Sequence, residues 1–256
     1  METLSLDSLL SAVMFVGLRV AGLMLVAPFF GNAGIPAPLK AAFTLALTAL
    51  LYPVCPVPRI YGGVVGWTGV VAGELIVGVL LGLAVQFVIE AAQVAGHVLG
   101  MQAGYSLATL FDPQTQADTP VMATFNQLIA LLIFLQLDVH HWLLRGLAAS
   151  FAYLPPGSAL TQAGATGGLL QAAGGVWLVA VQIAGPVIVA TLLVDITLGF
   201  LSKAAPQMPV LLVGLSIKTL VSLLVLAGAV RVWPGLFEEH FANAIAIAER
   251  LLRLSR

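Results

Sequence analysis

The chain contains few charged residues. They make up 8% of its 256 residues, against about 25% in a typical soluble domain. Hydrophobic residues reach 60%, so the chain lacks the polar groups that would cover a soluble surface. The sequence therefore predicts an all-α, multi-pass membrane protein.

Other absences narrow the class of function. The formal net charge is −1, so there is no basic excess that would favour nucleic acid. Cys55 is the only cysteine, and no disulfide can form within the chain. The motifs HExxH, GxSxG and the phosphate-binding P-loop are all missing. We therefore expect no enzyme, no cofactor and no metal.

Apolar segments alternate with stretches rich in proline and glycine. Six can be recognised, at residues 8–30, 37–55, 64–99, 121–139, 169–200 and 210–233. About 20 helical residues cross a bilayer core, and the third and fifth segments are longer. Each of these two is expected either to bend back on itself or to project beyond the hydrocarbon.

The C-terminal residues 234–256 have the pattern of an amphipathic helix. Glu238 and Glu239 lie at its start and Arg250 and Arg253 at its end, as the helix dipole favours. The helix is expected either to lie on the membrane surface or to dock a cytoplasmic partner. Its apolar residues recur at helical spacing: Phe237, Phe241, Ala244, Ile245, Ala248, Leu251 and Leu252.

Five charged residues lie within apolar segments, where a lipid-facing charge at a helix centre costs about 2.5–3.5 kcal/mol. They are expected to face protein, water or one another. For the long side chains of Arg19 and Lys218, reaching to the membrane interface is an equal alternative. The five are Arg19, Glu74, Glu90, Asp195 and Lys218.

The third segment carries a polar stripe. Gln86, Glu90, Gln93 and His97 are spaced four, three and four residues apart, which places them on one face of a helix. The stripe either forms hydrogen bonds inside the molecule or faces a conduit. Glycines also recur at GxxxG spacing, which lets helix backbones approach closely: Gly69 and Gly73, Gly78 and Gly82, and Gly96, Gly100 and Gly104.

Asp138, His140 and His141 carry side chains that can bind a metal. Adjacent histidines point to different faces of a helix, and these follow a hydrophobic run beside Trp142 and Arg145. The expected interpretation is a polar cluster at the membrane interface.

Three stretches resemble a known family. They are GELIVGVLLGL (73–83), QVAGHVLGMQAGYSLATLFDPQ (93–114) and KAAPQMPVLLVGLSIK (203–218), together with the opening RVAGLMLVAPFFGNAGIPAPLK (19–40). In order and spacing they are similar to the FliR family of flagellar export proteins, whose injectisome counterpart is the SctT or SpaR family. The similarity covers nearly the whole chain.

The resemblance implies an integral membrane subunit of the type III protein export gate, which serves flagellum assembly. Bent helical hairpins would build a helical cone, with residues 1–165 as a FliP-like part and 166–256 as a FliQ-like hairpin. The expected partners are FliP-like and FliQ-like subunits, FlhB-like and FlhA-like proteins and unfolded proteins in transit. The expected location is the bacterial inner membrane, within the flagellar basal body.

The resemblance also implies a plug at about residues 104–120. Leu107, Leu110 and Phe111 form an apolar patch before a polar loop that begins with Asp112 and Pro113. In a pore such side chains exclude water and ions by dewetting, although an ordinary loop is the simpler alternative.

Further polar residues are expected to make contacts between subunits: Glu74, Asp195, Lys203, Gln207 and Lys218. The alternative function is a self-contained proton-coupled secondary transporter, with Glu74, Glu90 and Asp195 as its relay. Such a transporter would drive solute uptake alone, whereas a gate subunit would copurify with other small membrane proteins.

Overall fold

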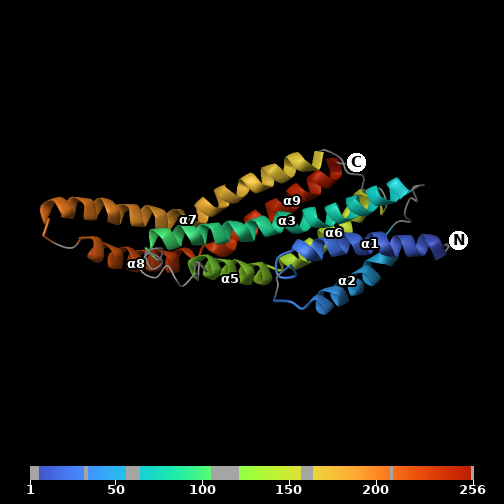
Figure 1. Cartoon of the computed structure of the whole chain (residues 1–256), viewed down its shortest axis with the longest axis horizontal. Helices are drawn as coiled ribbons and strands as arrows, with labels where there is room; N and C mark the ends of the chain where they lie inside the picture. The colour runs from blue at the N-terminus through green and yellow to red at the C-terminus, as the bar shows by residue number, and fades with distance from the viewer. Residues whose placement is uncertain are drawn as a thin grey trace. The chain divides into compact units, whose positions relative to one another are not determined.

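The computed structural model describes residues 6–31, 34–55, 64–104, 121–156, 164–207 and 210–254. Within these ranges the chain is helical and contains no strand, which confirms the predicted all-α class. The elements in chain order are α1 (Leu6–Val26), α2 (Ala37–Leu51), the 3-10 helix η1 (Tyr52–Val54), α3 (Val64–Gln102), α5 (Val121–Gln136), α6 (Val139–Tyr153), α7 (Gly164–Ala204), α8 (Val210–Ala229) and α9 (Trp233–Leu254) (Figure 1).

Several helices can cross a membrane. Three of the described helices, α1, α3 and α7, contain spans that are long and apolar enough. Two more spans are possible if α5 with α6, and α8 with α9, each count as one bent pair. Composition and helix length together identify a multi-pass membrane protein, as the sequence predicted.

The two overlong segments are single helices. α3 has 39 residues and α7 has 41, so at 1.5 Å per residue each is about 60 Å long. A bilayer core is about 30 Å thick, and an upright helix of this length must project beyond it. Neither helix bends back on itself, because α3 holds no proline and α7 continues through Pro186.

Helix α6 was not expected. The fourth apolar segment predicted from the sequence ends at residue 139, because Asp138, His140 and His141 interrupt it. The structure forms a further helix, and its buried residues recur at helical period: Val139, Leu143, Gly146, Leu147, Ser150 and Phe151. That period was the signal available in the sequence.

The amphipathic tail is confirmed as helix α9, and part of its apolar stripe is buried against the rest of the chain. Phe237 and Phe241 have no exposed surface, so their side chains face their own chain and not lipid or a partner. Near the end of the helix, Arg253 donates a hydrogen bond of 2.7 Å to the Tyr153 hydroxyl on α6. Ala248 and Leu252 of the stripe are also buried, whereas Ala244, Ile245 and Leu251 are half-buried. Whether α9 lies on the membrane surface or docks a partner stays a prediction.

Backbone contacts divide the chain into two compact units that alternate along the sequence. Unit 1 contains Met1–Phe87, Asp138–Gly174 and Phe241–Arg256, and unit 2 contains Val88–Leu137 and Gly175–His240. The division at residue 165 that the family resemblance implies is a separate matter and stays a prediction.

Glycines set the closest helix contacts of unit 1. A Cβ atom at Gly78 of α3 would overlap the carbonyl oxygen of Arg19 on α1, and one at Gly22 would overlap the carbonyl oxygen of Leu75. The backbones of α1 and α3 can touch only because these side chains are missing. By contrast, nothing lies within 4 Å of such an atom at Gly69.

In unit 2 a glycine likewise allows close contact between the backbones of α3 and α5. A Cβ atom at Gly96 would lie 2.5 Å from the Met122 carbonyl oxygen. Helices α7 and α8 run side by side as a hairpin (Figure 1), with Gly214 of α8 facing Leu198 of α7. The glycine spacing therefore indicated close helix packing correctly at positions 78, 82 and 96, and neighbours in the same chain supply the contacts.

Candidate functional site

The most deeply buried charges lie in unit 1, at Arg19 of α1. Its Nε donates a hydrogen bond of 2.7 Å to Oε2 of Glu74 on α3. Nη1 donates to the Ser150 hydroxyl at 2.9 Å, and Nη2 to the Leu154 carbonyl at 3.1 Å. The guanidinium carbon lies 4.2 Å from the ring centre of Phe151. One side chain thus joins α1, α3 and the end of α6.

This arrangement resolves the alternatives for two predicted residues. Arg19 does not reach to an interface, because its side chain has no exposed surface and all three of its nitrogen groups are bonded. Glu74 has the same burial, and its partner is Arg19 of the same chain instead of the expected second subunit. Buried charges of opposite sign are tolerated in this way when further hydrogen bonds satisfy them.

Cys55, the only cysteine, is close enough to respond to this pair. Burial raises the pKa of its thiol, Arg19 lowers it and Glu74 raises it. Since burial is the largest of these effects, the thiol stays protonated at neutral pH. We therefore expect a structural cysteine with little reactivity.

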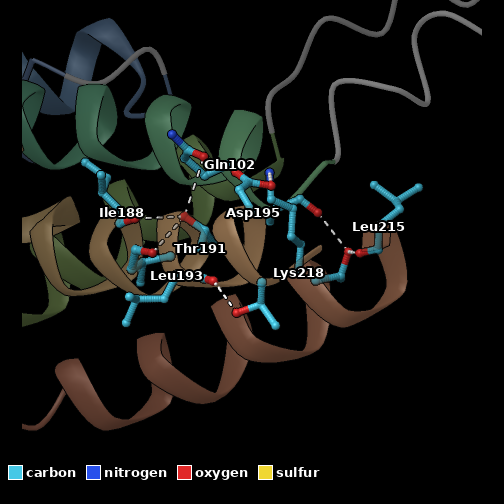
Figure 2. Close-up of polar contacts among 11 residues, drawn as sticks. Gln102, Ile188, Thr191, Leu193, Asp195, Leu215 and Lys218 are labelled. Atoms are coloured by element: carbon cyan, nitrogen blue, oxygen red, sulfur yellow. Dashed lines mark hydrogen bonds and ion pairs between the residues drawn. The ribbon is translucent and has the colours of Figure 1, made fainter. Parts of the chain in front are cut away.

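A second polar group lies in unit 2, where α3 ends against α7 and α8 (Figure 2). The Thr219 hydroxyl donates to the Ala103 carbonyl at 2.7 Å. It also lies 3.0 Å from the Leu215 carbonyl of its own helix, α8. Ala103 directly follows the last residue of α3, where no helical partner remains for its carbonyl. Thr219 therefore caps α3 from a neighbouring helix.

Gly104, two residues after the end of α3, has φ of +82°. Few side chains other than glycine adopt this left-handed conformation without strain, and a Cβ atom here would also run into Leu215 of α8. On the α7 side, the Thr191 hydroxyl lies 3.5 Å from Oε1 of Gln102 and bonds at 2.9 Å to the Val187 carbonyl. The end of α3, just before the predicted plug, therefore lies against both helices of the hairpin.

An ion pair links the same two helices. Nζ of Lys218 on α8 lies 2.7 Å from Oδ1 of Asp195 on α7 (Figure 2). About half of the Asp195 side chain and a fifth of the Lys218 side chain are exposed. The expectation that these charges face one another is confirmed, while a contact with another subunit stays a prediction.

Comparison with known proteins identifies the family. The model of "Bacterial export proteins, family 1" matches residues 10–244. The chain belongs to this family. It is 29% identical to the flagellar biosynthetic protein FliR of Bacillus subtilis over 98% of both chains. It is 30% identical to the flagellar biosynthetic protein FliR of Pectobacterium carotovorum, over 93% of this chain and 91% of the relative. It is also 30% identical to the flagellar biosynthetic protein FliR of Escherichia coli, over 88% of this chain and 87% of the relative.

Membership in an export family confirms the predicted resemblance. It makes the chain a membrane component of bacterial protein export. The two ion pairs Arg19–Glu74 and Lys218–Asp195 each join two helices of the chain.

The polar stripe lies on one helix, as predicted. Gln86, Glu90 and Gln93 are half-buried on α3, and His97 is exposed. Gln86 and Glu90 each have an interaction partner, so at least these two take part in local contacts. Whether the stripe faces a conduit stays a prediction.

The remaining predicted residues fall in two groups. Lys203 and Gln207 are exposed where the α7–α8 hairpin turns, and the proposed contacts with other subunits stay predictions. The plug residues lie outside the described residues, since the description stops at Gly104 and resumes at Val121. They are Leu107, Leu110, Phe111, Asp112 and Pro113.

The expected separation of His140 and His141 is wrong. Their ring centres lie only 4.1 Å apart. Both rings also approach the carboxylate of Asp138, at 3.8 Å for His140 and 3.3 Å for His141. Rotation about the side-chain bonds outweighs the different directions in which the two Cα–Cβ bonds leave the helix.

Proposed function

We propose that this protein is an integral membrane subunit of the type III protein export gate and serves the export of flagellar components. The observation that supports this most is similarity over nearly the whole chain to relatives that are each named flagellar biosynthetic protein FliR. The proposed location is the bacterial inner membrane, within the flagellar basal body. The proposed role is structural and gating, without a catalysed reaction.

The proposed partners are FliP-like and FliQ-like subunits, with residues 1–165 and 166–256 as the corresponding parts of this chain. Further proposed partners are FlhB-like and FlhA-like proteins and unfolded proteins in transit. Supporting evidence comes from the hairpin α7–α8, where a charged pair lies among exposed apolar side chains. A half-exposed carboxylate such as Asp195 is costly in contact with lipid, so contact with another protein subunit would be more favourable. The exposed apolar residues include Leu192, Leu193, Ile196, Phe200, Leu220 and Leu224.

Residues 104–120 are proposed to plug the closed gate. The support is the fixed start of this segment, where Gly104 contacts Leu215 and Ala103 accepts a hydrogen bond from Thr219. A plug must move aside while its base keeps its place. A rigidly packed base next to a polar loop fits this requirement.

The transporter alternative receives less support. A proton relay needs a path by which protons reach its carboxylates, and Glu74 has no exposed surface and is bonded to Arg19. Asp195 is likewise paired with Lys218. These two proposed relay groups instead join helices.

Two measurements test the proposal. Deletion of the gene should remove flagellar proteins from the culture medium while general secretion continues, and the restored gene should return them. A tagged chain should copurify in fixed stoichiometry with other small membrane proteins, and should be degraded faster when expressed alone. Normal flagellar secretion in the deletion strain, or solute uptake by the purified chain alone in vesicles, would contradict the export role.

A further inference from the structure

The segment that links α5 to α6 gathers three metal-binding side chains within unit 1. Asp138 has φ of 54°, in the left-handed region that aspartate adopts more readily than most residues. α6 begins at the next residue, so His140 and His141 lie in its first turn. This backbone turn folds the Asp138 side chain towards both imidazoles.

The position of the Asp138 carboxylate is unusual for its place at the helix start. An aspartate before a helix normally accepts a hydrogen bond from a backbone N–H of the first turn. Asp138 makes no such capping bond with its side chain. Its Oδ1 atom instead lies 3.3 Å from Nδ1 of His141 and 3.8 Å from Nε2 of His140.

One of these distances already matches a metal site. In a tetrahedral zinc site with bonds of about 2.0–2.1 Å, neighbouring ligand atoms lie about 3.3 Å apart, which is the separation of Asp138 and His141. All three ligand atoms lie within 4.8 Å of one another, and the imidazoles would have to rotate for all three to reach one ion. Two imidazoles and a carboxylate are ligands that Zn²⁺ accepts.

We propose that Asp138, His140 and His141 bind a divalent transition metal of the zinc class. The start of α6 carries about half an elementary positive charge from the helix dipole, which opposes a cation. The full negative charge of Asp138 exceeds it. The three side chains leave one coordination position for water or a partner group, as in other zinc sites with three protein ligands.

The metal would fix the start of α6. Its bonds would hold the left-handed conformation of Asp138 and the two rings of the first turn of α6 in one geometry. A simple Asp–His ion pair is the alternative, because the Asp138 and His141 side chains are 65% and 58% exposed. Such an exposed pair contributes little to stability.

A measurement of Zn²⁺ binding to the complex tests the proposal. The complex is purified through a histidine-free tag on the full chain. After removal of metal with a chelator, Zn²⁺ is titrated in competition with a chromophoric chelator, and Co²⁺ absorption reports the ligand geometry. We expect one tightly bound Zn²⁺ per copy of this chain. His140→Gln and His141→Gln should each weaken binding by about tenfold or more.

Matched variants separate the site from other ligands. His97→Gln changes an exposed histidine on α3, and Cys55→Ser removes the only thiol. Both should bind Zn²⁺ like the unchanged chain. Asp138→Asn keeps the size of the side chain and its tolerance of the left-handed conformation, so it should fold while losing affinity. Equal zinc binding by the His140→Gln/His141→Gln double variant, or no binding at micromolar Zn²⁺ by the unchanged complex, would overturn the proposal.

Discussion

The guanidinium of Arg19 and the carboxylate of Glu74 form an ion pair of 2.7 Å in which neither side chain has any exposed surface. The two residues lie 55 positions apart in the sequence and join α1 to α3. Two charges that are costly alone in an apolar interior here satisfy each other. The contact therefore fixes which helices of unit 1 are neighbours.

Removal of one partner should be severe. Glu74→Gln leaves the Arg19 charge buried without a counter-charge, and we expect a loss of about 3–5 kcal/mol in stability. Thermal unfolding of the purified complex measures this. The double variant Arg19→Met/Glu74→Leu should recover most of the loss, because apolar side chains often replace a buried pair without cost.

The matched control is Glu249→Gln on α9. Its carboxylate lies 3.9 Å from Arg253 and both side chains are partly exposed, and pairs of this kind contribute about 0.2–1 kcal/mol. Equal destabilisation by Glu74→Gln and Glu249→Gln would show that burial adds nothing to the contribution of the Arg19–Glu74 pair.

The fold class followed from the sequence, but the partners of the charges did not. Composition and helical periodicity are local properties, so they predicted an all-α membrane protein and the single stripe of α3. The pairing of Arg19 with Glu74 depends on which helices lie side by side. The sequence predicted only that such charges need protein, water or one another.

Two further features, helix α6 and the contact between His140 and His141, were not predicted from the sequence. Asp138 and the two histidines interrupt an apolar run, which concealed α6 even though its buried residues have helical period. The same histidines were expected to diverge, since successive residues on a helix point about 100° apart. Side-chain rotation brings their rings to 4.1 Å, a degree of freedom that no spacing argument contains.

Close packing at Gly78 gives a second prediction. Gly78→Ala places a methyl group into the backbone of Arg19, and such overpacking costs about 1–3 kcal/mol. Gly69→Ala makes the same change on the same helix where nothing lies within 4 Å. It should be neutral or slightly stabilising, because alanine favours helix. The thermal unfolding temperatures of the two variants test this prediction. A Gly78→Ala variant that is no less stable than Gly69→Ala would contradict the close packing at Gly78.

The end of α3 gives a third prediction. Thr219→Val keeps the shape of the side chain but leaves the Ala103 carbonyl without its donor, at a cost of about 1 kcal/mol. Amide hydrogen exchange of residues 101–104 should then accelerate about fivefold. Thr197→Val is the control, since that exposed hydroxyl bonds only to Leu193 of its own helix. Unchanged exchange in Thr219→Val would mean that this hydrogen bond does not hold the end of α3.

Glu90 gives a fourth prediction, in which the sign of the effect is decisive. If Glu90 faced lipid, Glu90→Leu would stabilise the helix, because the buried carboxylate is costly there. We expect the reverse, impaired assembly or export, because Glu90 has an interaction partner and lies on the polar stripe of α3. Complex yield and secreted flagellar protein report it. Met101→Leu, an exposed apolar change on the same helix, should behave like the unchanged chain.

The plug hypothesis gives the last prediction. Leu110 and Phe111 are expected to exclude water and ions from the closed gate, since an apolar constriction resists wetting. Replacement of both by serine should leave the assembled complex intact but let ions cross, measured as a fall in membrane potential or as conductance of the reconstituted complex. The control changes two polar residues of the same loop, Gln114→Ser and Gln116→Ser, and should stay tight. The complex with both serine changes could instead assemble and block ions as well as the unchanged complex. That result would show that Leu110 and Phe111 do not seal the gate.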